Sequence, residues 1–134
     1  MRGATAGAYT LNPDISIAVD VTLACDTPGT DEEDYISQLG KGTCIKVSDG
    51  GTISNHELVN TISELAEDHK IPYQMEILPA GGTDAKALQL VRGGSKTTTL
   101  SIPSRYIHTI VETINVKDLE ATLELLQLFC ETPQ

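Results

Sequence analysis

The chain alternates strand-like runs with helix-like segments, and this alternation limits its fold more than any other feature. The run ISIAVDVTLA, residues 15–24, is rich in β-branched residues, and shorter strand-like runs cover residues 42–47, 73–78 and 97–102. Runs of this length and composition, bounded by turn residues, predict strands. The run at 73–78 alternates polar and apolar residues as a half-buried strand does. Strands alternating with helices predict an α/β fold whose sheet is mostly parallel or mixed.

Helical periodicity accounts for the segments between and after these strands. Residues 54–70 carry apolar side chains at helical spacing after a Ser or Asn cap, and Pro72 stops the helix. A short helix is expected over residues 84–91, following a Thr or Asp cap. Residues 116–130 predict an amphipathic helix. Its apolar face is expected to carry Leu119, Leu123, Leu126 and Cys130.

The segment RGATAGAYTL, residues 2–11, predicts a helix that has no start signal. Only Met1 precedes it, whereas a helix in an α/β unit normally follows a strand and a capped loop. We therefore expect the chain to begin within an element.

Composition limits the class of partner and the cellular compartment. The 134 residues are the length of one domain, and they carry 9 Lys and Arg against 19 Asp and Glu. A net charge of −10 argues against nucleic acid or an anionic membrane surface, because phosphate binding needs clustered positive charge. No segment has the length of a transmembrane helix or the pattern of a signal peptide, so a cytoplasmic protein is expected. Cys25, Cys44 and Cys130 lack CxxC spacing and are interpreted as reduced, partly buried thiols.

Three polar groups lie at or near the carboxyl ends of strand-like runs, where ligands bind in open α/β sheets. They are Asp20 with Asp26, the run GGTD at residues 81–84, and the run SRYIH at residues 104–108. Each also has an ordinary structural interpretation as a turn, a helix cap or a hydrogen-bonded strand end. Asp carboxylate and His imidazole suit Zn²⁺ or Co²⁺, but two ligands do not complete a catalytic zinc site. The sequence contains no HExxH motif, GxSxG elbow or phosphate loop.

Four segments in order carry a resemblance to a known family. They are AVDVTLACDTPG, LGKGTCIKVSDGG, IPYQMEILPAGGTDAKALQ and LSIPSRYIHTIVE. Together they resemble the dinuclear-metal aminopeptidases of the glutamyl aminopeptidase and tetrahedral aminopeptidase type, some of which have been labelled endoglucanase or cellulase. The resemblance runs from Arg2 to about Phe129. It implies the C-terminal half of a zinc-peptidase-like three-layer α/β/α catalytic domain with a mixed, mostly parallel sheet. Residues 1–134 would then be a partial metallopeptidase domain without its N-terminal half or the inserted smaller domain.

The resemblance also implies roles for particular residues. Asp20 corresponds to a terminal ligand of one divalent metal, zinc or cobalt, and His108 to a terminal ligand of the other. The substrate side of the cleft is expected to involve Gly81, Gly82, Thr83, Asp84 and Arg105, with Tyr106 beside them. Family members are cytosolic exopeptidases that remove N-terminal residues from peptides and assemble into dodecamers.

The residues that would complete this site precede Met1 in the family. They include a metal-binding histidine, the bridging aspartate and a pair of glutamates, one of which is the general base. Bridged metals activate a water in such hydrolases, and the general base contributes roughly 10²–10⁴-fold to the rate. We therefore assign no catalytic residue and expect this chain to be an aminopeptidase fragment that is inactive alone.

Two other functions stay open from the sequence. One is a non-catalytic α/β module that associates with itself or with intact family subunits, because a partial domain leaves strand edges and apolar faces uncovered. The other is a glycosidase, which would need two facing carboxyl groups at a defined separation. No motif in the sequence marks such a pair.

Overall fold

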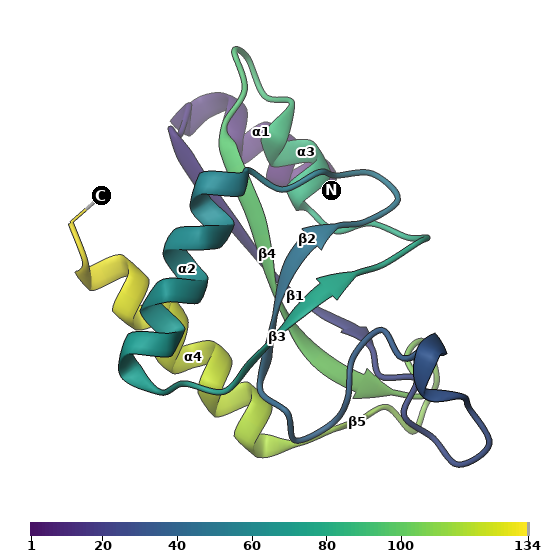
Figure 1. The fold of residues 1–134 in the computed structure, drawn as a ribbon. Coiled ribbons are helices and arrows are strands. Elements are labelled where there is room, and N and C mark those ends of the chain that lie inside the picture. Colours follow the sequence, from purple (N-terminus) through teal and green to yellow (C-terminus); the bar gives the residue numbers. More distant parts are fainter. Residues whose placement is uncertain (134) are drawn as a thin grey trace.

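The expected alternation of strands and helices is confirmed by the computed structural model, which describes residues 1–133 (Figure 1). In chain order the elements are α1 (Arg2–Leu11), β1 (Ile15–Leu23), the 3₁₀ helix η1 (Glu32–Asp34), β2 (Thr43–Ser48), α2 (His56–His69), β3 (Tyr73–Ile77), α3 (Ala85–Gln89), β4 (Lys96–Arg105), β5 (Thr113–Ile114) and α4 (Val116–Glu131). The fold is α/β, as predicted.

The sheet is mixed and its strand order is β1-β4-β2-β3, with β5 paired to the end of β4. β1 runs parallel to β4, and β2 runs parallel to β3. The two pairs meet where β2 lies antiparallel to β4, through Cys44 opposite Ser101 and Ile45 opposite Leu100. The carboxyl end of β3 therefore lies at the opposite end of the sheet from the carboxyl ends of β1 and β4.

Helices cover both faces of the sheet. α2 and α4 pack on the face that carries Ile45 and Leu100, whereas α3 packs against β1 and β4 from the other face, with α1 beside it (Figure 1). The apolar core under α2 and α4 consists of Ile45, Leu58, Val59, Ile62, Ala66, Ile71, Leu100, Ala121, Leu125 and Phe129. Each large apolar side chain buried there contributes about 1.5–3 kcal/mol of transfer free energy.

The predicted bounds of α2 follow from local signals. The Asn55 side chain accepts a hydrogen bond from the Leu58 amide at 2.9 Å, which caps the first turn. The helix ends at His69 and is followed by Lys70, a cap residue with a left-handed backbone two residues before Pro72. His56 and His69, at the two ends of this helix, are exposed.

Of the apolar face predicted for α4, Leu126 packs against the core as expected, but the prediction was wrong for the other three residues. Leu119 and Leu123 are 42% and 64% exposed, and Cys130 is also exposed, whereas the buried face carries Ala121, Thr122, Leu125 and Phe129. The reason lies at the start of the helix. The buried Asp118 carboxylate accepts the amides of Gly40 and Gly42 at 2.7 and 2.8 Å, which fixes the rotation of α4 about its axis.

β3 is half-buried, but its buried side is the polar one. Glu76 is fully buried, while Met75 and Ile77 are 48% and 62% exposed. β3 is an edge strand, so its apolar side is covered only in part, and Glu76 instead faces the buried Lys46 of β2.

β4 extends three residues beyond the predicted end, to Arg105, and includes Pro103. The proline lies beyond the two residues that β2 pairs, where the missing N–H removes no bond to that strand. The extension matters because it places Arg105 inside the sheet and His108 just past its end.

Candidate functional site

A cavity of about 240 Å³ lies where the predicted site residues meet. Its lining comes from the second half of β1, one residue of β2, the loop after β3 and the loop after β4. The lining residues are Asp20, Val21, Thr22, Leu23, Lys46, Leu78, Ala80, Gly81, Gly82, Thr83, Ile107 and His108. Apolar walls with a few polar groups are typical of a small-molecule or peptide site.

The loop after β3, residues 78–84, reaches this cavity by folding back across the sheet. It starts at the end of the sheet away from His108, because β3 runs antiparallel to β4. A hydrogen bond of 2.9 Å between the hydroxyls of Thr83 and Thr99 ties it to the middle of β4. Thr83 is buried, and its hydroxyl also accepts the Ala85 amide at 3.3 Å.

Five of the predicted site residues are brought together here: Asp20, Gly81, Gly82, Thr83 and His108 all line the cavity. The other two lie outside its lining. The Asp84 carboxylate pairs with the amino group of Met1 at 2.5 Å, and the Arg105 guanidinium pairs with Asp26. The roles expected for these seven residues remain predictions.

Asp20 approaches the cavity from β1, and His108 approaches it from the loop that follows the neighbouring strand β4. Asp20 is exposed, and one of its carboxylate oxygens accepts the Val21 amide at 2.8 Å. His108 is exposed in a tight loop, where its backbone φ is 64° and its amide donates to the Glu112 carboxylate. The carboxylate and the imidazole are ligands of the chemistry that Zn²⁺ and Co²⁺ prefer.

These two ligands do not complete a metal site. Residues 1–133 contain no cluster of three or more His, Cys, Asp or Glu side chains placed to hold a metal ion. A catalytic zinc ordinarily takes three protein ligands and a water. The described residues therefore offer two separate ligands of suitable chemistry at this cavity, and no hydrolytic step can be derived from them alone.

Lys46 is a cavity residue that sequence reasoning missed. Its ammonium lies 2.6 Å from the Glu76 carboxylate and 3.9 Å from that of Asp49, with all three side chains almost fully buried. Thr22, which also lines the cavity, donates its hydroxyl to Glu76. The available signal was a lysine inside the strand-like run GTCIKV. Its positive charge is balanced by two carboxylates.

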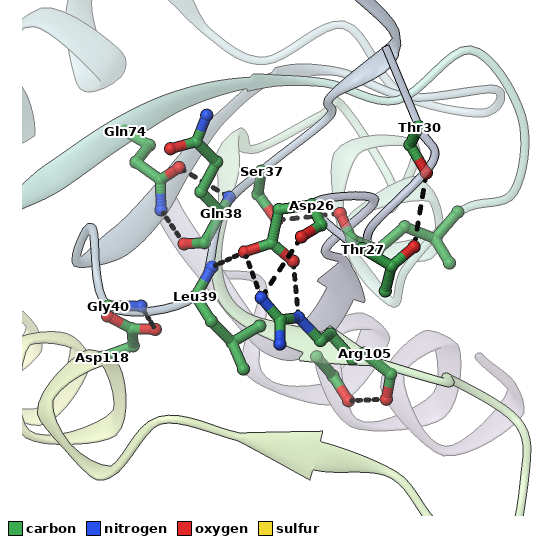
Figure 2. Close-up of polar contacts among 12 residues, drawn as sticks. Asp26, Thr27, Thr30, Ser37, Gln38, Leu39, Gly40, Gln74, Arg105 and Asp118 are labelled. Atoms are coloured by element: carbon green, nitrogen blue, oxygen red, sulfur yellow. Dashed lines mark hydrogen bonds and ion pairs between the residues drawn. The ribbon is translucent and has the colours of Figure 1, made fainter. Parts of the chain in front are cut away.

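Beside the cavity, Asp26 and Arg105 form a bidentate ion pair (Figure 2). Nε of Arg105 lies 2.7 Å from Oδ1 of Asp26, and Nη2 lies 3.0 Å from Oδ2. The Arg105 guanidinium holds the pKa of the Asp26 carboxyl below its usual value of 3.8, and the hydrogen bond from the Leu39 amide acts in the same direction. Both residues are therefore charged at neutral pH.

The cysteines supply no nucleophile that the structure supports. Burial, with the nearby negative charge of Glu76, raises the pKa of Cys44 to about 12, so its thiol is neutral at physiological pH. All three cysteines are unpaired thiols, and Cys130 is exposed rather than partly buried. Cys25 is half-buried.

The sequence pattern of the family described as M42 glutamyl aminopeptidase matches residues 1–125. A putative aminopeptidase of Acetivibrio thermocellus is 41% identical over 126 residues, which are 94% of this chain and 38% of the relative. Among solved structures, aminopeptidase APDkam598 from the archaeon Desulfurococcus kamchatkensis is 37% identical and superimposes with a TM-score of 0.96, over 98% of this chain and 38% of that one.

A third similar protein is the TET1 peptidase of Pyrococcus horikoshii, described as assembling into a tetrahedron or a large octahedral shell. It is 34% identical with a TM-score of 0.81, over 96% of this chain and 36% of that one. The chain thus spans less than two-fifths of the length of each of these proteins. Within residues 1–133, none of the helices has the length and apolar character needed to cross a membrane.

Proposed function

Because the chain belongs to the M42 glutamyl aminopeptidase family, we propose that it supplies one part of a two-metal aminopeptidase site. In this proposal Asp20 is the terminal ligand of one metal and His108 that of the other. The observation that carries it is the cavity, which Asp20 and His108 line together with Gly81, Gly82 and Thr83. When bound, zinc or cobalt would activate a water for attack on the first peptide bond.

The part played by this chain is to bind and orient. The loop at residues 78–84 is fixed to β4 through Thr83 and forms one wall of the cavity, where a peptide backbone can approach the two glycines closely. Apolar side chains from β1 and from the two loops exclude water from the same space. Asp84 and Arg105 take part in the proposal only as residues beside this wall.

Residues 1–134 alone are proposed to be inactive, because the described part supplies only two of the proposed metal ligands and we assign none of its residues as the general base. The purified chain should hold fewer than two metal ions by elemental analysis. It should not hydrolyse aminoacyl p-nitroanilides when zinc or cobalt is added. Two tightly held ions together with chelator-sensitive hydrolysis would overturn this part of the proposal.

A chimera tests the aminopeptidase role directly. The part of the Acetivibrio thermocellus relative that precedes the matched segment would be fused to this chain. We expect metal-dependent hydrolysis of N-terminal residues, with Asp20→Asn and His108→Ala each lowering kcat at least 10²-fold. The exposed His56 and His69, changed to alanine, serve as matched controls that keep activity. A folded chimera whose activity survives His108→Ala would contradict the proposed ligand role.

The wider setting of the site follows from the same proposal. The substrates would be peptides, the compartment would be the cytoplasm, and the assembly would be a homo-oligomer of the kind described for the TET1 peptidase.

A second candidate function is that of a non-catalytic module that associates with itself or with intact family subunits. It is favoured by the exposure of apolar side chains on both edge strands of the described sheet, Val19 on β1 and Met75 and Ile77 on β3. Light scattering across a range of concentrations tests this candidate, and a chain that remains monomeric throughout would exclude self-association.

A further inference from the structure

We propose that Asp26 and Arg105 form a clamp that positions His108, and that Arg105 acts through this loop rather than by binding substrate. The name clamp refers here to these two residues, and the His108 loop to residues 106–112. The inference rests on the proposed role of His108 as a metal ligand. It assigns a positioning role to Arg105, the residue that the family resemblance places on the substrate side of the cleft.

The guanidinium of Arg105 makes three hydrogen bonds to Asp26. Besides the two carboxylate contacts at 2.7 and 3.0 Å, Nη2 of Arg105 lies 3.2 Å from the backbone oxygen of Asp26. The Asp26 side chain is 10% exposed and that of Arg105 is 32% exposed, so the pair is largely shielded from water. A planar guanidinium can satisfy all three contacts, whereas a lysine ammonium makes a single-point contact.

One carboxylate connects three segments that are distant in sequence (Figure 2). Asp26 lies in the loop after β1, Arg105 ends β4, and the Leu39 amide donates to Oδ2 of Asp26 at 2.9 Å. The segment that contains Leu39 continues to Gly40, which is bound by Asp118 of α4. The clamp therefore fixes the end of β4 to a part of the molecule that the core holds in place.

The His108 loop begins at the next residue and depends on that base. Tyr106 and His108 both have left-handed backbones, with φ of 57° and 64°. This conformation costs roughly 1–2 kcal/mol per non-glycine residue, so the surroundings must hold it. At the loop base Arg105 pairs with Thr113 of β5, and inside the loop the Thr109 amide donates to the Tyr106 oxygen at 3.2 Å.

Two other hydrogen bonds of the loop, from the His108 amide to the Glu112 carboxylate and from the Thr109 hydroxyl to the Tyr106 oxygen at 2.6 Å, join residues of the loop to one another and not to the rest of the molecule. Tyr106, His108 and Thr109 are exposed, and Ile107 is half-buried. With few buried contacts of its own, the loop takes its position from the last residue of β4. Arg105 itself is not among the residues that line the cavity, and its Nε and Nη2 atoms are already bonded to Asp26.

The test measures loop order in this chain by ¹⁵N relaxation. In the unmodified chain we expect backbone order parameters of about 0.85 at Tyr106 and His108, and values below about 0.6 in Arg105→Gln and Asp26→Asn. Arg105→Lys should give intermediate order parameters, because lysine keeps the positive charge but cannot make the two parallel hydrogen bonds that the guanidinium makes with the Asp26 carboxylate. The matched control is Lys96→Gln, which breaks the exposed 2.6 Å ion pair with Glu57 at the other end of β4. Its loop values should not change.

The outcomes separate the clamp from general stability and from the proposed activity. Unchanged loop order in both folded Arg105 variants or in Asp26→Asn, or an equal change in Lys96→Gln, would overturn the inference. In the active chimera, Arg105→Gln should lower kcat at least tenfold with little change in KM, whereas loss of a substrate contact would raise KM. An inactive chimera whose loop still responds to Arg105→Gln would count against the proposed function and leave the clamp standing.

Discussion

At Gly42 the chain turns with a backbone φ of +97° directly against the main chain of Pro72 and Tyr73. A Cβ placed on Gly42 would lie 2.0 Å from the Pro72 oxygen, far inside van der Waals contact. The same residue donates its amide to the Asp118 carboxylate that anchors α4. A side chain at this position would be strained by the positive φ and would collide with the main chain of Pro72.

Gly42→Ala should therefore lower the free energy of unfolding by about 3 kcal/mol or more, from left-handed strain and from overpacking together. The matched control is Gly7→Ala in α1, where a Cβ meets nothing within 4 Å. That change should raise stability by up to about 1 kcal/mol, because alanine is the better helix former. Urea unfolding followed by far-UV circular dichroism measures both. If the free energy of unfolding of Gly42→Ala were within about 1 kcal/mol of that of the unmodified chain, the predicted clash with Pro72 would be wrong.

Asp26 gives a prediction about pH. Its pKa in the folded chain is lowered chiefly by the hydrogen bond with Arg105, so the charged carboxylate is the form that stabilises the fold. This contribution is fully present above the usual pKa of 3.8 and is lost as the pH falls through the lower folded pKa. Asp26→Asn should thus cost most stability near pH 7, and the difference should shrink below about pH 4. Exposed Asp68, changed to Asn, is the control, and a cost that does not vary with pH would exclude an ionic origin.

At the scale of elements, β2 and β3 are joined by an ion pair in the sheet interior. The Lys46 ammonium and the Glu76 carboxylate are 2.6 Å apart, and neither side chain is more than 1% exposed. Removing one partner leaves a buried charge, which costs about 3–5 kcal/mol, whereas replacing both with apolar residues of similar volume is often neutral.

A double-mutant cycle tests this expectation. Lys46→Met and Glu76→Leu should each destabilise by about 3–5 kcal/mol, and the double variant should recover part of this loss but not all of it, because the buried Asp49 carboxylate then lacks its cation. Additive losses in the double variant would show that packing, rather than charge pairing, dominates at this position.

The same elements show which parts of the fold the sequence can predict. α2 was predicted with its cap and its stop, because Asn55 and Pro72 act within the helix or next to it. The buried faces of α4 and β3 were not, because they depend on partners elsewhere: Asp118 binds amides 76 and 78 residues away, and Glu76 faces Lys46 across a register that no local pattern reveals.

The candidate site divides in a similar way. Asp20 and His108 were predicted because each sits in a motif that resembles the family, and the cavity brings them together. The partner of Arg105 was not predicted, because Asp26 lies 79 residues away in sequence and becomes its neighbour only when β1 pairs with β4. Lys46 was missed for a related reason, since one lysine in a strand-like run does not show which carboxylate it meets.

For the molecule as a whole, the two edges of the described sheet offer strands with which another chain could pair. β1 pairs only with β4 and β3 only with β2, so each presents one unpaired row of backbone groups. Val19 on β1 and Met75 on β3 add apolar side chains that are about half exposed. Edge strands with apolar side chains pair readily with another chain.

We therefore expect concentration-dependent self-association of residues 1–134 by light scattering or sedimentation. If the β1 edge forms the contact, Val19→Lys should raise the dissociation constant at least tenfold, and if the β3 edge forms it, Met75→Lys should do so. In either case a lysine must be desolvated at the new strand contact. Leu90→Lys is the matched control, since Leu90 is 73% exposed outside both edges. If all three variants associate like the unmodified chain, the contact lies elsewhere. If neither the unmodified chain nor any variant associates, the prediction of self-association through the sheet edges is wrong. The first result would direct attention to the exposed side of α4, where Leu119 and Leu123 form the next apolar surface.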